Sequence, residues 1–150
     1  MTGLKRILMV EDDERDVELT LQALEKHNLA NQVTVVSDGE QALDYLFSRA
    51  AFAGRKGGDP ILVLLDLKMP KVNGLEVLKA IKADERLKVI PVVVLSSSRE
   101  TPDLVECYKH GVNAYVVKPV DFVDFMNAVT QLGLFWAAVN QPPPARLATA

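Results

Sequence analysis

Charged and polar residues stand at the ends of four apolar runs in this sequence. In chain order they are Glu11, Asp12, Asp13, Asp66, Ser96 and Lys118. Asp66 is the most informative, because it directly follows the aliphatic run "ILVLL". An ionised carboxylate is costly to bury without partners, so Asp66 has to meet water, a cation or hydrogen-bond donors where its run ends. Its chemistry depends on which other run ends lie beside it.

The acidic residues indicate a site for a divalent cation. Carboxylates within ~5 Å of one another repel by about 3 kcal/mol per pair at an effective dielectric constant near 20, so a cluster of them needs a compensating charge. Mg²⁺ takes oxygen ligands, keeps several waters, and is usually held by one or two carboxylates together with phosphate oxygens. We expect Glu11 or Asp12 to hold Mg²⁺ together with Asp66, and the backbone carbonyl of Lys68 to complete the site.

The same residues are suited to phosphoryl transfer. A carboxylate beside Mg²⁺ can attack phosphorus and form an aspartyl phosphate. Because this reaction needs mainly positioning and charge stabilisation, one lysine and one hydroxyl around the aspartate are enough. Lys118 supplies the charge, and Ser96 supplies a hydroxyl for a phosphoryl oxygen. Lys118 also precedes a proline, which favours a cis peptide bond.

Five apolar runs, separated by segments of helical periodicity, indicate a sheet covered by helices. Strands are expected at residues 6–10, 32–36, 61–66, 91–96 and 114–118. Strands that alternate with helices are joined by right-handed crossovers, which predicts an α/β domain with a parallel sheet. In a doubly wound sheet ligands bind beyond the carboxyl ends of the strands, so the residues above would meet at one edge.

Side chains able to cap helices precede the helical segments. The expected caps are Ser37, Asn73, Thr101 and Asp121. Read alone, Glu11 to Asp13 would also be a helix cap with acids favoured by the helix dipole. Only the joint arrival of these acids, a hydroxyl and a lysine at one sheet edge favours a functional site.

The composition is that of a soluble domain in a reducing compartment. The chain has 150 residues, 49% of them hydrophobic and 25% charged, and its net charge of -3 argues against a nucleic-acid surface. The single cysteine, Cys107, excludes an internal disulfide. No signal peptide is evident, and no uninterrupted apolar run approaches ~18 residues, so we expect a cytoplasmic protein without a membrane span.

Four motifs together resemble the receiver domain of two-component response regulators. They are "VEDDE", "LLDLKMPKVNG", "VVVLSSS" and "YVVKPVD", and the resemblance covers residues 5 to about 132. It implies a flavodoxin-like fold, a doubly wound five-stranded parallel sheet in the order 2-1-3-4-5 with helices on both faces.

The resemblance also assigns roles to single residues. The implied roles are phosphoacceptor for Asp66, metal ligands for Glu11 and Asp12, phosphoryl-binding hydroxyl for Ser96, invariant lysine for Lys118, aromatic switch for Tyr115, and small residue guarding access for Ser97. Lys68 departs from the family pattern, because a long cation follows the acceptor by two residues. We expect it to alter the lifetime of the phosphoryl group.

Two further features are similar to the single-domain regulators that accompany phytochrome-type sensor kinases. One is the glycine-rich loop at 51–60, and the other is the ending "LFWAAVNQPPP". The resemblance implies a receiver domain at 1–136 and a proline-rich arm at 137–150. It implies phosphorylation by a sensor histidine kinase, of the phytochrome type in this subgroup, and a switched surface for protein partners. The protein would not be an enzyme beyond slow loss of its own phosphoryl group.

Three other functions share part of this pattern. A magnesium-dependent phosphohydrolase of the haloacid dehalogenase type also uses a strand-end aspartate, but it requires a second aspartate where this chain has Lys68. A flavodoxin-like nucleotide-binding module would need a glycine-rich phosphate loop after the first strand, where "VEDDERD" stands instead. An adaptor that is never phosphorylated differs only in whether Asp66 accepts phosphate.

The end of the last helical segment predicts an interface. Leu132, Leu134, Phe135 and Trp136 are too close in sequence to share one helical face, so burying all four against the domain is difficult. Exposed aromatic residues of this kind mark interfaces, which predicts a symmetric homodimer formed by this helix and the C-terminal arm. Alternatively, Phe135 and Trp136 fold back onto their own subunit.

Overall fold

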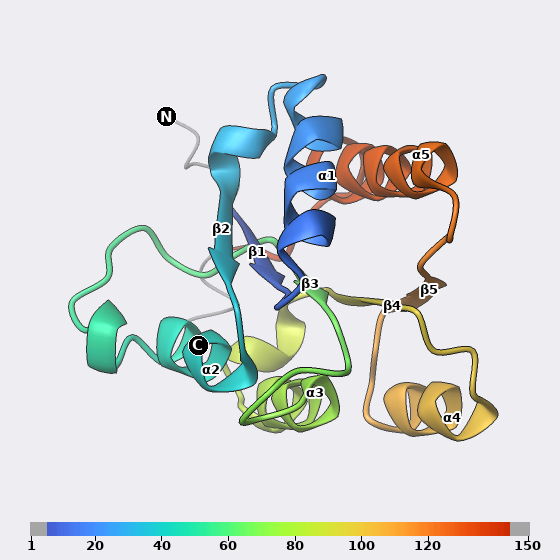
Figure 1. Cartoon of the computed structure of the whole chain (residues 1–150). Coiled ribbons are helices and arrows are strands. Elements are labelled where there is room, and N and C mark those ends of the chain that lie inside the picture. Colours follow the sequence, from blue (N-terminus) through green and yellow to red (C-terminus); the bar gives the residue numbers. More distant parts are fainter. Residues whose placement is uncertain (1–5, 145–150) are drawn as a thin grey trace.

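Five short parallel strands form one sheet at the centre of the molecule (Figure 1). The computed structural model describes residues 6–144, and the strands follow the order β2-β1-β3-β4-β5, as predicted. Their bounds are β1 (Ile7–Val10), β2 (Val33–Val36), β3 (Leu62–Leu65), β4 (Val92–Ser96) and β5 (Ala114–Val117). The three inner strands are buried along their whole length, which explains why their sequences read as unbroken apolar runs.

Helices cover both faces of the sheet (Figure 1). On one face lie α1 (Glu14–Glu25) and α5 (Phe122–Gly133), which pack against each other. On the other face lie α2 (Gly39–Leu46), α3 (Gly74–Ala83) and α4 (Thr101–Lys109). The remaining short segments are the 3-10 turns η1 (Ala30–Gln32), η2 (Ala50–Phe52) and η3 (Leu87–Val89), and the π-helical segment η4 (Leu134–Val139).

Strand side chains alternate between the two faces and so divide the core. The cluster that includes α2, α3 and α4 contains Leu8, Val10, Val63, Leu65, Val92 and Val94. The neighbouring positions Ile7, Leu62, Leu64, Val93 and Leu95 belong to clusters on the other side. This period of two fixes which face each strand residue contacts, and hence the register of the whole sheet.

Two of the four predicted helix caps are confirmed and two are wrong. Asn73 accepts a hydrogen bond from the Glu76 amide, and Asp121 caps α5. Asp38, not Ser37, caps α2: Asp38 Oδ1 accepts a hydrogen bond from the Gln41 amide, whereas the Ser37 hydroxyl donates to the Gln41 side chain.

The α4 helix begins one residue earlier than its sequence predicts. Thr101 is its first residue, and Glu100 precedes it without a side-chain capping bond. Pro102 lies in the first turn, where its missing N–H would have no helical partner, so this end has one fewer amide for a cap to satisfy.

The last helix continues past α5 and packs against its own subunit. Leu132, Trp136 and Ala137 contact the cluster that holds Ile7 and Leu62, while Phe135 remains 48% exposed. The stretch Phe122–Val139 is long and apolar enough to cross a membrane by length and composition alone, although polar residues such as Asp124 and Gln131 interrupt its apolar run. Only 22% of this stretch is buried, and its buried side chains, among them Phe125, Val129 and Ala137, pack on this domain along one face. Residues 145–150 of the predicted arm lie outside the described residues.

Candidate functional site

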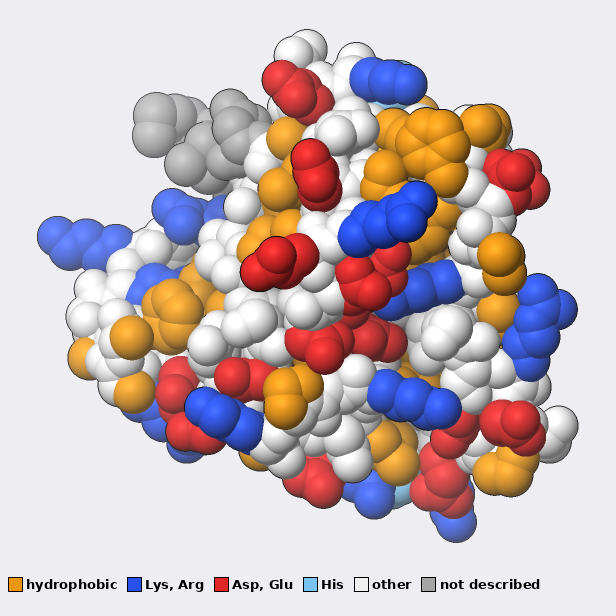
Figure 2. All heavy atoms as spheres, viewed as in Figure 1, with side chains coloured by type: hydrophobic (Ala, Val, Ile, Leu, Met, Phe, Trp, Pro, Cys, Tyr) orange, Lys and Arg blue, Asp and Glu red, His pale blue; other side chains and the backbone are white. Residues whose placement is uncertain are grey.

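The register of the inner strands brings the acidic residues together. Val10 of β1 pairs with Leu65 of β3, and the Asp66 amide donates to the Val10 carbonyl over 3.0 Å. Glu11 and Asp66 are therefore the first residues after the same rung of two neighbouring strands. In Figure 2, acidic side chains gather near the middle of the face, in the part of the view where Figure 1 places β1 and β3.

Three carboxylates form a group that can hold a divalent cation. Ligand oxygens of Glu11, Asp12 and Asp66 all lie within 4.8 Å of one another. Glu11 and Asp66 are buried at 3% and 9% exposure, whereas Asp12 is exposed to solvent. A donor set made only of carboxylate oxygens, open on one side, fits a hard cation that keeps some of its water.

Burial makes this group reluctant to ionise fully without a cation. Desolvation raises the pKa of Glu11 to about 7, the Asp66 charge adds to the increase, and the hydrogen bond from Lys118 opposes it. Desolvation likewise raises the pKa of Asp66, against the attraction of Lys118. The Asp66 charge thus disfavours ionisation of Glu11, whereas a hydrogen bond with Glu11 lowers the pKa of Asp66 and the Asp12 charge raises it. A bound cation would favour the ionised form of all three carboxylates.

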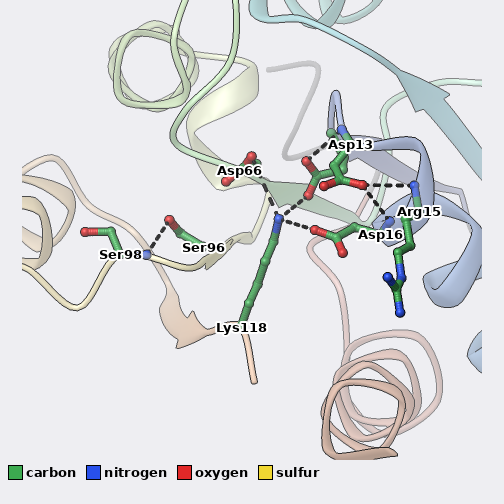
Figure 3. Close-up of polar contacts among 8 residues, drawn as sticks. Asp13, Arg15, Asp16, Asp66, Ser96, Ser98 and Lys118 are labelled. Atoms are coloured by element: carbon green, nitrogen blue, oxygen red, sulfur yellow. Dashed lines mark hydrogen bonds and ion pairs between the residues drawn. The ribbon is translucent and has the colours of Figure 1, made fainter. Parts of the chain in front are cut away.

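Lys118 reaches into the same group from the end of β5. Its amide donates to the Ser96 carbonyl over 2.7 Å, which places Lys118 beside the end of β4. Its Nζ donates to Glu11 Oε1 at 2.5 Å and to Asp16 Oδ2 at 2.8 Å, and lies 3.8 Å from Asp66 Oδ2 (Figure 3). Burial alone would lower the pKa of Lys118, but the hydrogen bonds to Asp16 and Glu11 outweigh it and raise the pKa.

The Lys118–Pro119 bond is trans, because residues 6–144 contain no cis peptide bond. The cis Lys118–Pro119 bond that the sequence predicted is therefore not found. Lys118 directly follows β5 in a register fixed by its own amide hydrogen bond, so the turn does not depend on a cis proline.

The β4–α4 loop links the hydroxyl of Ser96 to Tyr115. Ser96 is buried at the end of β4, and its Oγ accepts a hydrogen bond from the Ser98 amide (Figure 3). The Ser98 carbonyl in turn accepts from Tyr115 Oη at 2.9 Å, and Ser98 Oγ is bonded to Asp103 of α4. Tyr115 is half-buried against the core, so in this structure its ring is already turned inward.

The loop that follows Asp66 approaches the start of α3 very closely. A Cβ on Gly74 would lie 2.1 Å from the Asp66 carbonyl oxygen, so no larger residue fits without moving this loop. The Gly74 amide donates to the Leu67 carbonyl and holds the approach in place. Lys68 is exposed in the same loop and lines a hollow of about 520 Å³ that also reaches Asp12.

Two residues of this site were missed by sequence reasoning. Asp16, in the first turn of α1, was only one of several acids suited to a helix N-terminus. Its position three residues after the cap Asp13 did place it at the correct end of the sheet. Ser98 is the third serine of "SSS", and nothing in the sequence separates it from the exposed Ser97.

Comparison with known proteins gives a consistent result. The family model described as "Response regulator receiver domain" matches residues 7–130. The response regulator Rcp1 of Synechocystis sp. is 34% identical over 141 residues, which are 94% of this chain and 95% of Rcp1. The crystal structure of its Mn²⁺-bound form covers 93% of this chain and 99% of its own, with a TM-score of 0.87.

Two further solved structures are similar over nearly the whole chain. The phosphorylated cyanobacterial phytochrome response regulator RcpA is 37% identical, with a TM-score of 0.88, and the match covers 93% of this chain and 99% of RcpA. The bacteriophytochrome response regulator AtBRR is 57% identical, with a TM-score of 0.74 and coverage of 93% and 100%.

Proposed function

We propose that this chain, which belongs to the response regulator receiver domain family, accepts a phosphoryl group on Asp66 from a histidine kinase. Its membership in this family, with phytochrome response regulators among its relatives, confirms the resemblance drawn from the sequence. The family does not favour the phosphohydrolase, nucleotide-binding or adaptor alternatives. The observation that carries the assignment of Asp66 is its buried carboxylate, which lies 3.8 Å from the Lys118 ammonium among two other carboxylates.

Each residue of the site has its own role in the phosphoryl transfer. An Asp66 carboxylate oxygen forms a bond to phosphorus while the P–N bond of the phosphohistidine breaks and its electron pair returns to the imidazole. Lys118 offsets negative charge on the phosphoryl oxygens, and the Ser96 hydroxyl donates to one of them. Glu11, Asp12 and Asp66 would hold Mg²⁺, with the Lys68 carbonyl as a further ligand, and Mg²⁺ supplies additional positive charge when bound.

The surface beside Lys118 supports a protein donor. Val120 is fully exposed, and Phe122 and Val123 are 50% and 55% exposed, all where β5 connects to the start of α5. Exposed apolar side chains next to a phosphoacceptor suit docking of a kinase helix. We propose a sensor histidine kinase of the phytochrome type, because several relatives are phytochrome response regulators. This partner and the buried free thiol of Cys107 support a cytoplasmic location.

The effect of phosphorylation reaches the surface through the β4–α4 loop. If Ser96 moves toward a phosphoryl oxygen, the Ser98 amide that donates to its Oγ would move with it, and Ser98 also contacts Tyr115 and Asp103. The surface made by α4, β5 and α5 would then change the contacts it offers. Slow hydrolysis of the aspartyl phosphate returns the protein to its resting state.

Phosphate transfer from a phosphorylated kinase tests the assignment of Asp66. Asp66→Asn should abolish acid-stable, base-labile labelling, while Asp44→Asn on α2 should label as the wild type does. Labelling of Asp66→Asn at the wild-type rate would contradict the proposal.

A homodimer remains part of this proposal in a modified form. Phe135 and Val139 are 48% and 71% exposed, whereas Leu132 and Trp136 pack on their own subunit and Leu134 is half-buried. Sedimentation should show a dimer for the full chain and a monomer for Phe135→Ser with Val139→Ser. Val105→Ser, which removes an equally exposed side chain from α4, should leave the dimer intact. A monomeric wild-type chain at micromolar concentration would reject the dimer.

A further inference from the structure

Asp16 contacts Lys118 without belonging to the three-carboxylate group described above. Its Oδ2 accepts a hydrogen bond from Lys118 Nζ at 2.8 Å, and the side chains are 22% and 10% exposed. Asp16 lies on α1 and Lys118 just after β5, 102 residues apart in sequence. Their contact is therefore set by the packing of α1 against the end of the sheet and not by local chain geometry.

The contact determines where the ammonium points. An ammonium group has three N–H donors, and here two of them are bonded to Glu11 and Asp16. Asp66 lies farther away, at 3.8 Å, which is an ion pair but longer than a hydrogen bond. Asp16 thus draws the ammonium toward α1 and away from the proposed acceptor (Figure 3).

We propose that Asp16 is a positioning residue that restrains Lys118, favouring a cation among the carboxylates and opposing a phosphoryl group on Asp66. The inference rests on the proposed function, because Asp66 has to be the acceptor. With Asp16 charged, less of the Lys118 charge is directed at the carboxylates, so a cation meets less repulsion. A phosphoryl group meets the opposite situation, since Asp16 adds negative charge nearby and competes for the same ammonium.

Two equilibrium measurements on the full chain test the proposal. One is the affinity for Mg²⁺ alone, by calorimetry. The other is the affinity for BeF₃⁻, an anion that mimics a phosphoryl group on aspartate, at saturating Mg²⁺ and constant ionic strength. Asp16→Asn should weaken Mg²⁺ binding roughly 3- to 10-fold and strengthen BeF₃⁻ binding roughly 3- to 10-fold, the range for removing one partly screened charge near a site.

Two matched variants separate position from charge. Glu14→Gln removes the same charge from an exposed site in the same helical turn, and both affinities should stay within about twofold of the wild type. Asp16→Glu keeps the charge and should restore both affinities toward the wild-type values.

Opposite shifts in Asp16→Asn support the proposal, since a damaged fold would weaken both ligands together. Parallel weakening, or shifts no larger than those of Glu14→Gln, would overturn it. If the wild type binds Mg²⁺ and BeF₃⁻ but Asp66→Asn still accepts phosphate, the proposed acceptor is wrong. If the assignment of Asp66 is correct and Asp16→Asn leaves both affinities unchanged, only the role of Asp16 is wrong.

Discussion

Replacing Glu11 by glutamine should change how the stability of the protein depends on pH. Glu11 is 3% exposed, and desolvation by burial is the largest cause that raises its pKa from 4.5 to about 7. Between these two values the folded protein binds the proton more tightly than the unfolded chain does. The free energy of unfolding therefore falls as pH rises through this window. The glutamine side chain cannot ionise, so the Glu11→Gln variant lacks this part of the pH dependence.

The size of the effect follows from the shift. One pKa unit corresponds to about 1.4 kcal/mol, so the shift of Glu11 amounts to about 3 kcal/mol between pH 4.5 and pH 8. The pKa of about 7 already includes the hydrogen bond from Lys118, which lowers the Glu11 pKa, so the predicted change with pH needs no separate allowance for that bond. The informative quantity is how the difference between the two proteins changes with pH.

Urea unfolding at intervals from pH 4.5 to pH 8, without divalent cations, measures this difference. Relative to Glu11→Gln, the wild type should lose about 3 kcal/mol of unfolding free energy across the range. Adding Mg²⁺ at about 100 times its dissociation constant should return about 2.7 kcal/mol to the wild type at pH 8 and less at pH 5. Parallel curves for the two proteins would refute the reasoning, because they would mean that Glu11 ionises normally in the folded state.

Two further substitutions test how the loops hold the site. Gly74→Ala places a Cβ against the Asp66 carbonyl and should lower the free energy of unfolding by about 1–3 kcal/mol. Ala83→Gly at the end of α3 is the control for backbone effects. An unchanged denaturation midpoint for Gly74→Ala would show that the loop moves freely. Tyr115→Phe removes the hydrogen bond to the Ser98 carbonyl and should lower the free energy of unfolding by about 1 kcal/mol. Tyr108→Phe, on the exposed face of α4, should change it little. Equal effects of the two substitutions would mean that the bond to Ser98 contributes nothing to stability in the resting protein.

The sheet could be predicted from the sequence because burial on both faces leaves a simple pattern. Runs such as "ILVLL" cannot be amphipathic, and each predicted strand is found within one residue of its expected limits. The convergence of Glu11, Asp66, Ser96 and Lys118 then follows from strand order, since parallel strands end at one edge. Family resemblance supplied the order itself, which periodicity alone does not determine.

Contacts between distant elements could not be predicted in the same way. The Asp16–Lys118 bond depends on how α1 rotates and packs above the sheet, and no local pattern encodes that rotation. The same holds for Trp136. The sequence predicted that Leu132, Leu134, Phe135 and Trp136 could not all be buried, but not which of them would be exposed: Trp136 packs on the cluster that holds Ile7 and Leu62, and Phe135 stays 48% exposed.

The position of Trp136 makes it a built-in optical probe. It is the only tryptophan in the chain, and it packs on the cluster that holds Ile7 and Leu62, the first residues of β1 and β3. The chain after it reaches Pro142, which lines a hollow with Ile61 and Pro91 just before β3 and β4, whereas Asp66 follows the last residue of β3. The indole is therefore separated from the carboxylate cluster by the length of the strands. Any change in its emission when Mg²⁺ binds would have to travel through the sheet or along the continuous helix from Phe122 to Val139, so its fluorescence distinguishes a local event from one that reaches the far end of the domain.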